Sequence, residues 1–312
     1  MKKTNKSFWC LALSGVMLLS GCEKKANSDL SEISVSSVPE TTSITAFPAL
    51  SCGVRIEKAP DKIVSLSPAV TEIICEMGFK DKLVGISNYC DYPNGLNAEK
   101  VGSTENPDID AIVKLKPDIV FTLSELSERE AYTLKQADIT VLTAEPPKNM
   151  EGFSALYREI AAAFYGRETT ESEKETEKAV QIGSDARLAL ENAAKNVKLD
   201  SFIYVTEKLT IAGTDTFESA VLCLSGTNIC DEKGYVSADK LKSAPKYIVA
   251  DNTLSEDDLA KDETLNGFIN GGAEVRFVNA AAFERPTART ADVFKELSNN
   301  TETVSSNEQS SY

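Results

Sequence analysis

Apolar residues in this chain gather in short β-rich runs that alternate with stretches of helical spacing. After a first run at residues 62–66 (KIVSL), Ser67 and Pro68 supply a helix cap and a first helical residue, and Gly78 marks the end of the helix. The other runs that predict strands are residues 83–87, 118–122, 139–143, 201–206, 209–212, 247–250 and 274–279. Because such alternation is typical of parallel strands with helical crossovers, the sequence predicts an α/β fold.

The middle of the chain interrupts this alternation. Residues from about 150 to 196 contain no run that predicts a strand, and residues 171–197 form one long, charged helical pattern. A helix that is polar over much of its circumference is typical of a bridge between two bodies. At 1.5 Å per residue, this helix would extend roughly 35–40 Å.

One sequence unit occurs on both sides of that helix. Residues 110–121 (DAIVKLKPDIVF) and 239–250 (DKLKSAPKYIVA) each contain an acidic first helical turn, a proline and then a buried strand. We therefore predict two Rossmann-like lobes joined by a single long backbone helix. The expected N-terminal lobe covers residues 53–168, the linking helix 169–197 and the C-terminal lobe 198–298.

The N-terminal end has the layout of an export signal. Residues 1–21 carry a basic head and an apolar stretch that is too short to span a bilayer comfortably, and they end in LSG before Cys22. This run resembles a lipobox, whose cysteine thiol takes a diacylglyceryl group before the leader is removed. The alternative is an ordinary signal peptide or an uncleaved anchor with a chance cysteine. Residues 22–52 predict a flexible tether, and residues 299–312 predict a disordered tail.

Charge and histidine content exclude several classes of function. The net charge of −15 argues against nucleic acid as a partner and against electrostatic adhesion to anionic lipid. The chain contains no histidine, which excludes histidine-ligated metal or haem and any mechanism with a histidine base. Membrane attachment would therefore depend on the lipid at Cys22, in an extracytoplasmic, membrane-anchored protein.

The cysteines give no metal-binding pattern. Cys10 belongs to the signal peptide, and the spacing of the cysteines after Cys22 contains no CxxC motif, so we expect no zinc site. Cys75 and Cys223 occur in apolar helical stretches, where we expect them to be small buried side chains. One disulfide is possible among the cysteines that follow the signal, which are Cys52, Cys75, Cys90, Cys223 and Cys230.

Several segments resemble a known family. Residues 63–72 (IVSLSPAVTE) resemble the opening strand and helix of class III substrate-binding proteins of ABC importers. Residues 84–93 (VGISNYCDYP), 100–103 (KVGS) and 283–285 (FER) resemble the cobalamin-binding members. The resemblance covers roughly residues 55–298. It implies a monomeric binding lipoprotein without catalytic activity, which holds cobalamin or a related corrinoid between its lobes and delivers it to an ABC permease.

The expected ligand site lies beyond the carboxyl ends of the strands, as in other open α/β sheets. One loop follows the strand at residues 83–87 and the other follows the strand at residues 274–279. A corrin ring is broad and flat with amides on its rim, so it needs aromatic contact and a few hydrogen-bonding groups. The candidate aromatic contacts are Tyr89, Tyr92, Tyr235 and Phe283, and the candidate polar contacts are Asp91, Glu284 and Arg285.

Simpler roles remain open for three of these candidates. Asp91 and Tyr92 also form a good turn before Pro93, and Arg285 fits a solvated surface charge. We interpret Phe283 as a ligand contact rather than a core residue, because the sequence Glu-Arg-Pro directly after it indicates a loop.

The resemblance also implies a docking role for two acidic residues. In the family, one glutamate on each lobe docks into arginine pockets of the permease, and the resemblance places these at Asp110 and Asp239, which are both aspartates, one methylene shorter. Two separated carboxylates on rigid lobes would fix the orientation of the docked protein. The alternative is that each carboxylate complements the dipole of its own helix.

Three other functions were weighed. A ferric siderophore is the second choice as ligand, with Arg285 and Arg289 as cations for an anionic compound, and haem with Tyr89 or Tyr92 as iron ligand is the third. A surface hydrolase is a remote alternative, since no residue pattern activates a nucleophile and no phosphate-binding loop is present. We expect no resident cofactor and no resident metal ion.

Overall fold

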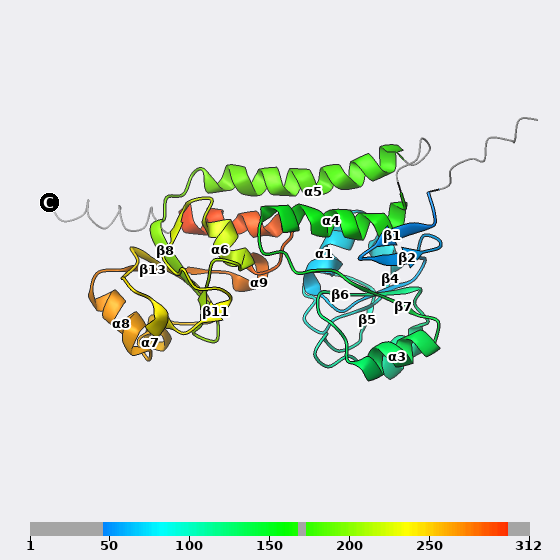
Figure 1. Ribbon diagram of the computed structural model, residues 1–312, viewed down its shortest axis with the longest axis horizontal. Coiled ribbons are helices and arrows are strands. Elements are labelled where there is room, and N and C mark those ends of the chain that lie inside the picture. The colour runs from blue at the N-terminus through cyan, green and yellow to red at the C-terminus, as the bar shows by residue number, and fades with distance from the viewer. Residues whose placement is uncertain (1–45, 168–172, 299–312) are drawn as a thin grey trace, which may run out of the picture. The chain divides into compact units, whose positions relative to one another are not determined.

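The computed structural model describes residues 46–167 and 173–298. The predicted signal peptide, Cys22, most of the predicted tether and the predicted tail lie outside these residues. All described residues belong to one compact unit of the chain. Within it, two separate β-sheets define an N-terminal and a C-terminal lobe (Figure 1). None of the helices in the described ranges has both the length and the apolar character needed to cross a membrane.

The N-terminal lobe contains a five-stranded parallel sheet in the order β5-β4-β3-β6-β7. Its strands are β3 (Ile63–Ser65), β4 (Leu83–Ile86), β5 (Glu99–Lys100), β6 (Ile119–Thr122) and β7 (Thr140–Thr143). The crossovers contain α1 (Pro68–Glu76), η1 (Lys80–Lys82), α2 (Ile109–Leu115) and α3 (Glu128–Gln136). The central strands β3 and β6 are buried throughout, as expected of a parallel sheet covered on both faces.

Local sequence signals explain where α1 begins and ends. The Ser67 side chain accepts a hydrogen bond from the Val70 amide, and Pro68 occupies the first helical position. The helix ends at Met77 and is followed by Gly78, whose φ of +86° is the left-handed conformation that glycine adopts at low cost. The predicted start and end of this helix are confirmed.

Two long helices connect the lobes, and a β-hairpin packs on one of them. The antiparallel pair β1 (Ala49–Ser51) and β2 (Val54–Ile56) packs on α4 (Met150–Tyr165), and α4 packs along α5 (Glu173–Ala194). Figure 1 shows α5 running above both lobes, with α4 between it and the N-terminal lobe. The helix α5 lies inside the range predicted for the linking helix. It is not an unsupported bridge, because α4 packs against it.

The C-terminal lobe contains a six-stranded mixed sheet. Its main order is β11-β9-β8-β12-β13, with β10 also paired to β8. The strands are β8 (Asp200–Val205), β9 (Ile211–Ala212), β10 (Gly226–Asn228), β11 (Tyr235–Val236), β12 (Tyr247–Asp251) and β13 (Glu274–Val278). The helices are α6 (Phe217–Leu222), η2 (Ala238–Lys240), α7 (Glu256–Leu259), α8 (Glu263–Asn270), α9 (Ala280–Phe283) and η3 (Ala288–Ala291), and residues 292–298 are also helical.

The largest hydrophobic core extends from one lobe into the other. It includes Ile73 and Phe121 of the N-terminal lobe together with Phe202 and Phe294 of the C-terminal lobe. Phe153 of α4 stacks on Phe217 of α6, with 6.0 Å between the ring centroids. The lobes therefore share buried apolar surface in addition to the helical connection.

Candidate functional site

A pocket of about 350 Å³ lies between the two lobes, at the carboxyl ends of their parallel strands. The N-terminal lobe contributes the loops after β6 and β7, and the C-terminal lobe contributes α6, β11 and the segment after α9. We call this space the interlobe pocket. Its lining residues are Leu123, Pro146, Pro147, Lys148, Asp215, Thr216, Phe217, Glu218, Gly234, Tyr235, Glu284 and Pro286.

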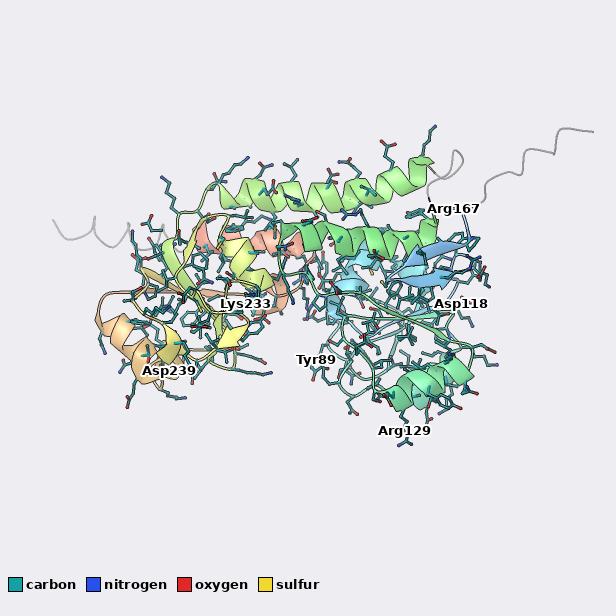
Figure 2. The ribbon with its side chains drawn as sticks, viewed as in Figure 1. Tyr89, Asp118, Arg129, Arg167, Lys233 and Asp239 are labelled. Atoms are coloured by element: carbon teal, nitrogen blue, oxygen red, sulfur yellow. The ribbon has the colours of Figure 1, made fainter. Side chains whose placement is uncertain are left out.

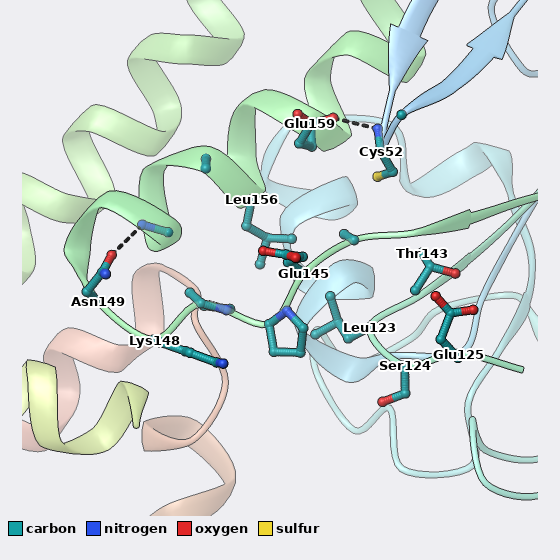
Figure 3. Close-up of a pocket in the computed structure, with 16 residues that line it drawn as sticks. Cys52, Leu123, Ser124, Glu125, Thr143, Glu145, Lys148, Asn149, Leu156 and Glu159 are labelled. Atoms are coloured by element: carbon teal, nitrogen blue, oxygen red, sulfur yellow. Dashed lines mark hydrogen bonds between the residues drawn. The ribbon is translucent and has the colours of Figure 1, made fainter. Parts of the chain in front are cut away.

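A larger pocket of about 860 Å³ adjoins the interlobe pocket on the N-terminal lobe. We call it the hairpin pocket, because the turn between β1 and β2 forms one wall. Figure 3 shows Cys52 in that turn beside Glu159 of α4, whose carboxylate accepts a hydrogen bond from the Cys52 amide. Both pockets share Leu123 and the 146–148 segment as lining, so they lie side by side, and we call the two pockets together the hollow.

Three carboxylates, those of Asp215, Glu218 and Glu284, line the C-terminal wall of the interlobe pocket. Glu218 is buried, and both of its carboxylate oxygens lie 3.0–3.1 Å from the Tyr235 hydroxyl. Glu284 accepts a hydrogen bond of 2.9 Å from the Tyr204 hydroxyl. Among the described residues that line this pocket, Lys148 is the one cation. The wall therefore offers hydrogen-bond acceptors and negative charge.

Desolvation governs the ionisation of these carboxylates. Although Glu284 as a residue is exposed, the protein around its carboxyl removes enough water to raise its pKa to about 7, and the charges of Glu218 and Asp251 add to the effect. Burial likewise raises the pKa of Glu218 above its ordinary value. An incoming N–H donor would stabilise both ionised carboxylates, whereas an incoming anion would meet like charge.

Three predicted tyrosines offer exposed aromatic surface, and one of them, Tyr235, lines the interlobe pocket. Tyr89 is 67% exposed and Tyr92 is 43% exposed in the loop after β4. Figure 2 shows Tyr89 on the side of the N-terminal lobe that faces the other lobe. Tyr235 is half-exposed and lines the interlobe pocket. Their roles as ligand contacts stay predictions, and their exposure is compatible with those roles.

The structure contradicts the ligand-contact interpretation of Phe283. This residue is fully buried at the end of α9, and its ring packs edge-on against Tyr204 with 5.0 Å between centroids. The chain does turn at Glu-Arg-Pro, but the phenylalanine before the turn points into the hydrophobic core of the protein. Phe283 is therefore a core residue that supports the wall bearing Glu284.

Arg285 is neither a solvated charge nor a free group for ligand binding. Its Nη1 donates to Asp91 and, at 3.0 Å, to Glu72 of α1, and its Nη2 donates to the Tyr89 carbonyl oxygen at 3.1 Å. Partial desolvation of Asp91 raises its pKa, but the hydrogen bond and the charge of Arg285 have the larger combined effect, so the pKa of Asp91 is lowered. Asp91 and Arg285 thus bind each other across the two lobes.

A second arginine completes this connection, which we call the Glu72 ion cluster. Arg289 Nη1 donates to the same Glu72 oxygen at 3.0 Å, and its guanidinium lies 4.2 Å from the centroid of the Tyr92 ring. The other Glu72 oxygen accepts from the Thr287 hydroxyl at 3.0 Å. Arg289, considered above as a cation for an anionic siderophore, is therefore bound to Glu72. The Glu72 ion cluster comprises Glu72, Asp91, Arg285, Thr287 and Arg289.

Glu76 makes a further bond between the lobes one helical turn later. Its carboxylate accepts from the Tyr157 hydroxyl of α4 at 2.6 Å and from the Ala288 amide at 3.3 Å. Burial raises the pKa of Glu76. Sequence reasoning missed both Glu72 and Glu76. A signal was available, because Glu72 interrupts the apolar face of a helix, where an acidic residue requires a partner.

The two predicted docking residues are both exposed. Asp110 lies in the first turn of α2, and Asp239 lies in η2, a single 3-10 turn where the sequence predicted a short helix. Figure 2 shows Asp239 at the outer margin of the C-terminal lobe. A hydrogen bond from Ser237 lowers the pKa of Asp239. The following strands β6 and β12 occupy matching places, each beside the first parallel strand of its sheet.

The five described cysteines are free thiols. Cys223 is exposed and Cys75 is partly exposed, so the prediction that both are buried is wrong. Cys223 caps the C-terminus of the short helix α6, where the chain leaves the core. Within residues 46–167 and 173–298, no group of three or more histidine, cysteine or acidic residues could hold a metal ion.

Comparison with known sequences identifies the family. The family described as Periplasmic binding protein matches residues 63–266. The ABC transporter substrate-binding lipoprotein YvrC of Bacillus subtilis, itself uncharacterized, is 30% identical over 230 residues, which are 70% of this chain and 70% of that protein. The vitamin B12-binding protein of Pectobacterium atrosepticum is 25% identical over 236 residues, 73% of this chain and 77% of that protein.

Solved structures share the fold. The periplasmic vitamin B12 binding protein BtuF of Vibrio cholerae aligns with a TM-score of 0.59 and 22% identity, covering 77% of this chain and 96% of that one. A periplasmic heme binding protein from Pseudomonas aeruginosa aligns with a TM-score of 0.63 and 19% identity, and the alignment covers 77% of this chain and 91% of that one. The predicted fold class is confirmed. The chain belongs to the periplasmic binding protein family, whose members are substrate-binding proteins of ABC transporters and not enzymes.

Proposed function

We propose that this member of the periplasmic binding protein family captures cobalamin or a related corrinoid between its lobes and delivers it to an ABC permease. The observation that carries the proposal is the composition of the interlobe wall. Glu218 and Glu284 provide acceptors, Tyr235 provides an aromatic face, and Lys148 is the one cation among the described lining residues. A corrin ring has amide N–H donors on its rim and broad apolar faces, which match these groups.

The shape of the hollow supports a large ligand. The interlobe pocket is smaller than a corrinoid, but the larger hairpin pocket adjoins it along shared lining residues. The exposed rings of Tyr89 and Tyr92 extend the aromatic surface on the N-terminal lobe. The relatives named vitamin B12-binding proteins support the same ligand class.

The alternative ligands fit this wall less well. An anionic ferric siderophore requires converging cations, and the two arginines considered for it bind Glu72. Haem carries two propionate carboxylates, which would approach Glu218 and Glu284. Haem now ranks above the siderophore as the second candidate, because exposed Tyr89 could provide an iron ligand and solved structures with this fold are described as heme binding proteins.

Delivery of the ligand to the permease would depend on the N-terminal lipid and on acidic residues at the outer surface of each lobe. A lipid on Cys22 would hold the protein at the outer side of the cell membrane as a monomer. Asp110 and Asp239 would dock on arginine pockets of the permease. The shared core and the Glu72 ion cluster support small lobe movement on ligand binding, because large movement would expose apolar surface and separate buried charges.

The test is a binding assay with the soluble protein from residue 46 onward, which keeps strand β1. Cyanocobalamin, haem and a ferric siderophore are each coloured, so each can be followed by its visible absorbance during size-exclusion chromatography. We expect cyanocobalamin to co-elute with the protein and the other two to separate from it. Co-elution of the siderophore or haem alone would refute the corrinoid proposal.

A further inference from the structure

Glu218 is an unusual group to find in the wall of a binding pocket. It lies in the first turn of α6, yet the residue is only 5% exposed, because its side chain faces the interlobe pocket and not the solvent. A carboxylate in such a place requires hydrogen-bond donors. Its own amide and Thr216 partly offset the rise that burial causes in its pKa.

The remaining donor is a single tyrosine hydroxyl. Tyr235 lies within 3.1 Å of both Glu218 oxygens but has one proton to give. An ionised carboxylate can accept about four hydrogen bonds, so acceptor capacity is left on the pocket side. Tyr235 lines the same pocket, so an aromatic side chain lies next to Glu218 in its wall.

A second carboxylate makes the wall sensitive to the charge of a ligand. Glu284 lines the same pocket and interacts electrostatically with Glu218. Asp215 is a third carboxylate in the lining of this pocket. Such a wall disfavours an acidic ligand, because like charges in contact are costly in a partly desolvated site. An amide N–H group at the same position would instead donate to Glu218 and relieve the repulsion between the two residues.

Resting on the proposed function, we infer that Glu218 determines specificity for the side chains on the corrin rim. It selects corrinoids whose peripheral side chains are amides and rejects those whose side chains are free carboxylic acids. The physical basis is that a site which accepts a hydrogen bond from the ligand discriminates strongly against a ligand that has no N–H group at that position. The protein would thereby take up completed corrinoids and leave hydrolysed ones outside.

The experiment compares two coloured probes that share one ring. Dicyanocobinamide carries amide side chains, and dicyanocobyrinic acid carries carboxylic acids at the same positions. Affinities for wild type, Glu218→Gln and the exposed control Glu256→Gln are measured by equilibrium dialysis at pH 7.5, with thermal unfolding as a check of folding. We expect wild type and the control to prefer the amide probe by roughly tenfold or more. We expect Glu218→Gln to lose most of that preference, mainly through tighter binding of the acid.

Each outcome decides between the claims. If wild type binds neither probe, the corrinoid function itself fails. If wild type binds both probes equally, the corrinoid function stands and the inference about Glu218 is overturned. This comparison of the two probes uses the wild-type protein alone. If Glu218→Gln keeps the wild-type preference, the selection lies elsewhere and the inference is again overturned.

Discussion

Replacement of Glu72 by glutamine tests the Glu72 ion cluster most directly. The Glu72 side chain is fully buried, and the side chains of Arg285 and Arg289 that bind it are 14% and 21% exposed. Glutamine keeps the volume and one acceptor oxygen but removes the charge. Two guanidinium groups would then face a neutral amide, and only Arg285 would keep a carboxylate partner, the exposed Asp91.

The expected cost follows from the burial of this group. Removing one partner of a buried ion pair costs about 3–5 kcal/mol, because the remaining charge stays desolvated. The slight exposure of both arginines places the expected loss near the lower end, at about 3 kcal/mol. For a protein of this size, each kcal/mol shifts Tm by about 2–4 °C, so the Tm should fall by roughly 6–12 °C.

The assay is thermal and urea unfolding followed by circular dichroism, with Glu57→Gln as the matched control. Glu57 pairs with Arg55 on the surface, where both side chains are more than half exposed, so its loss should cost about 0–1 kcal/mol. Adding Arg289→Met to Glu72→Gln should restore part of the stability, because it removes a cation that has lost its anion. A loss below about 1 kcal/mol in Glu72→Gln would show that the cluster does not stabilise the fold.

Three further predictions concern other parts of the molecule. Because the pKa of Glu284 is raised from 4.5 to about 7 in the folded protein, the unfolded chain releases this proton first, and the folded state loses stability as the pH rises through this range. The Glu284→Gln variant should not lose stability in this way. The loss in wild type is at most about 1–2 kcal/mol after solvent screening. It is measured as the fall in Tm between pH 4.5 and pH 7.5 in wild type, compared with the fall in the variant. Gly183→Ala should lower the free energy of unfolding in urea by about 1–3 kcal/mol, because its Cβ would lie 2.7 Å from the Cβ of Tyr157 on α4. The control Gly267→Ala has open space around it and should be neutral or stabilising. Equal effects of the two substitutions would contradict the close approach of α4 and α5. Asp110→Ala and Asp239→Ala should leave ligand affinity unchanged and reduce uptake in cells that depend on the transporter, and unchanged uptake in the double variant would reject the docking role.

Much of the fold could be predicted because its signals are local. The cap at Ser67, the glycine after α1 and the β-rich runs each depend on a few neighbouring residues, and the structure has them close to the predicted positions. The repeated unit likewise supplies β6 and β12, which occupy matching places in the two sheets. Local propensity and apolar periodicity were sufficient for these elements.

The candidate site was harder to predict because its groups depend on distant partners. Arg285 binds Glu72, which lies 213 positions earlier in the chain, so no local pattern shows that this arginine is already paired. Phe283 is buried because Tyr204 lies beside it, and that contact also joins separate elements. Glu218 resembled any acidic residue at the start of a helix until the position of β11 placed Tyr235 against it.

The hydrophobic core that runs from Phe121 to Phe202 has a consequence for engineering. An isolated lobe would leave the apolar side chains at that shared core facing water, so we expect neither lobe to fold when it is expressed alone. Chimeras that join one lobe of this protein to the other lobe of a relative would have to match side-chain shapes across the join. Ligand preference in such proteins is therefore more easily altered by point substitutions in the pocket wall than by exchanging whole modules.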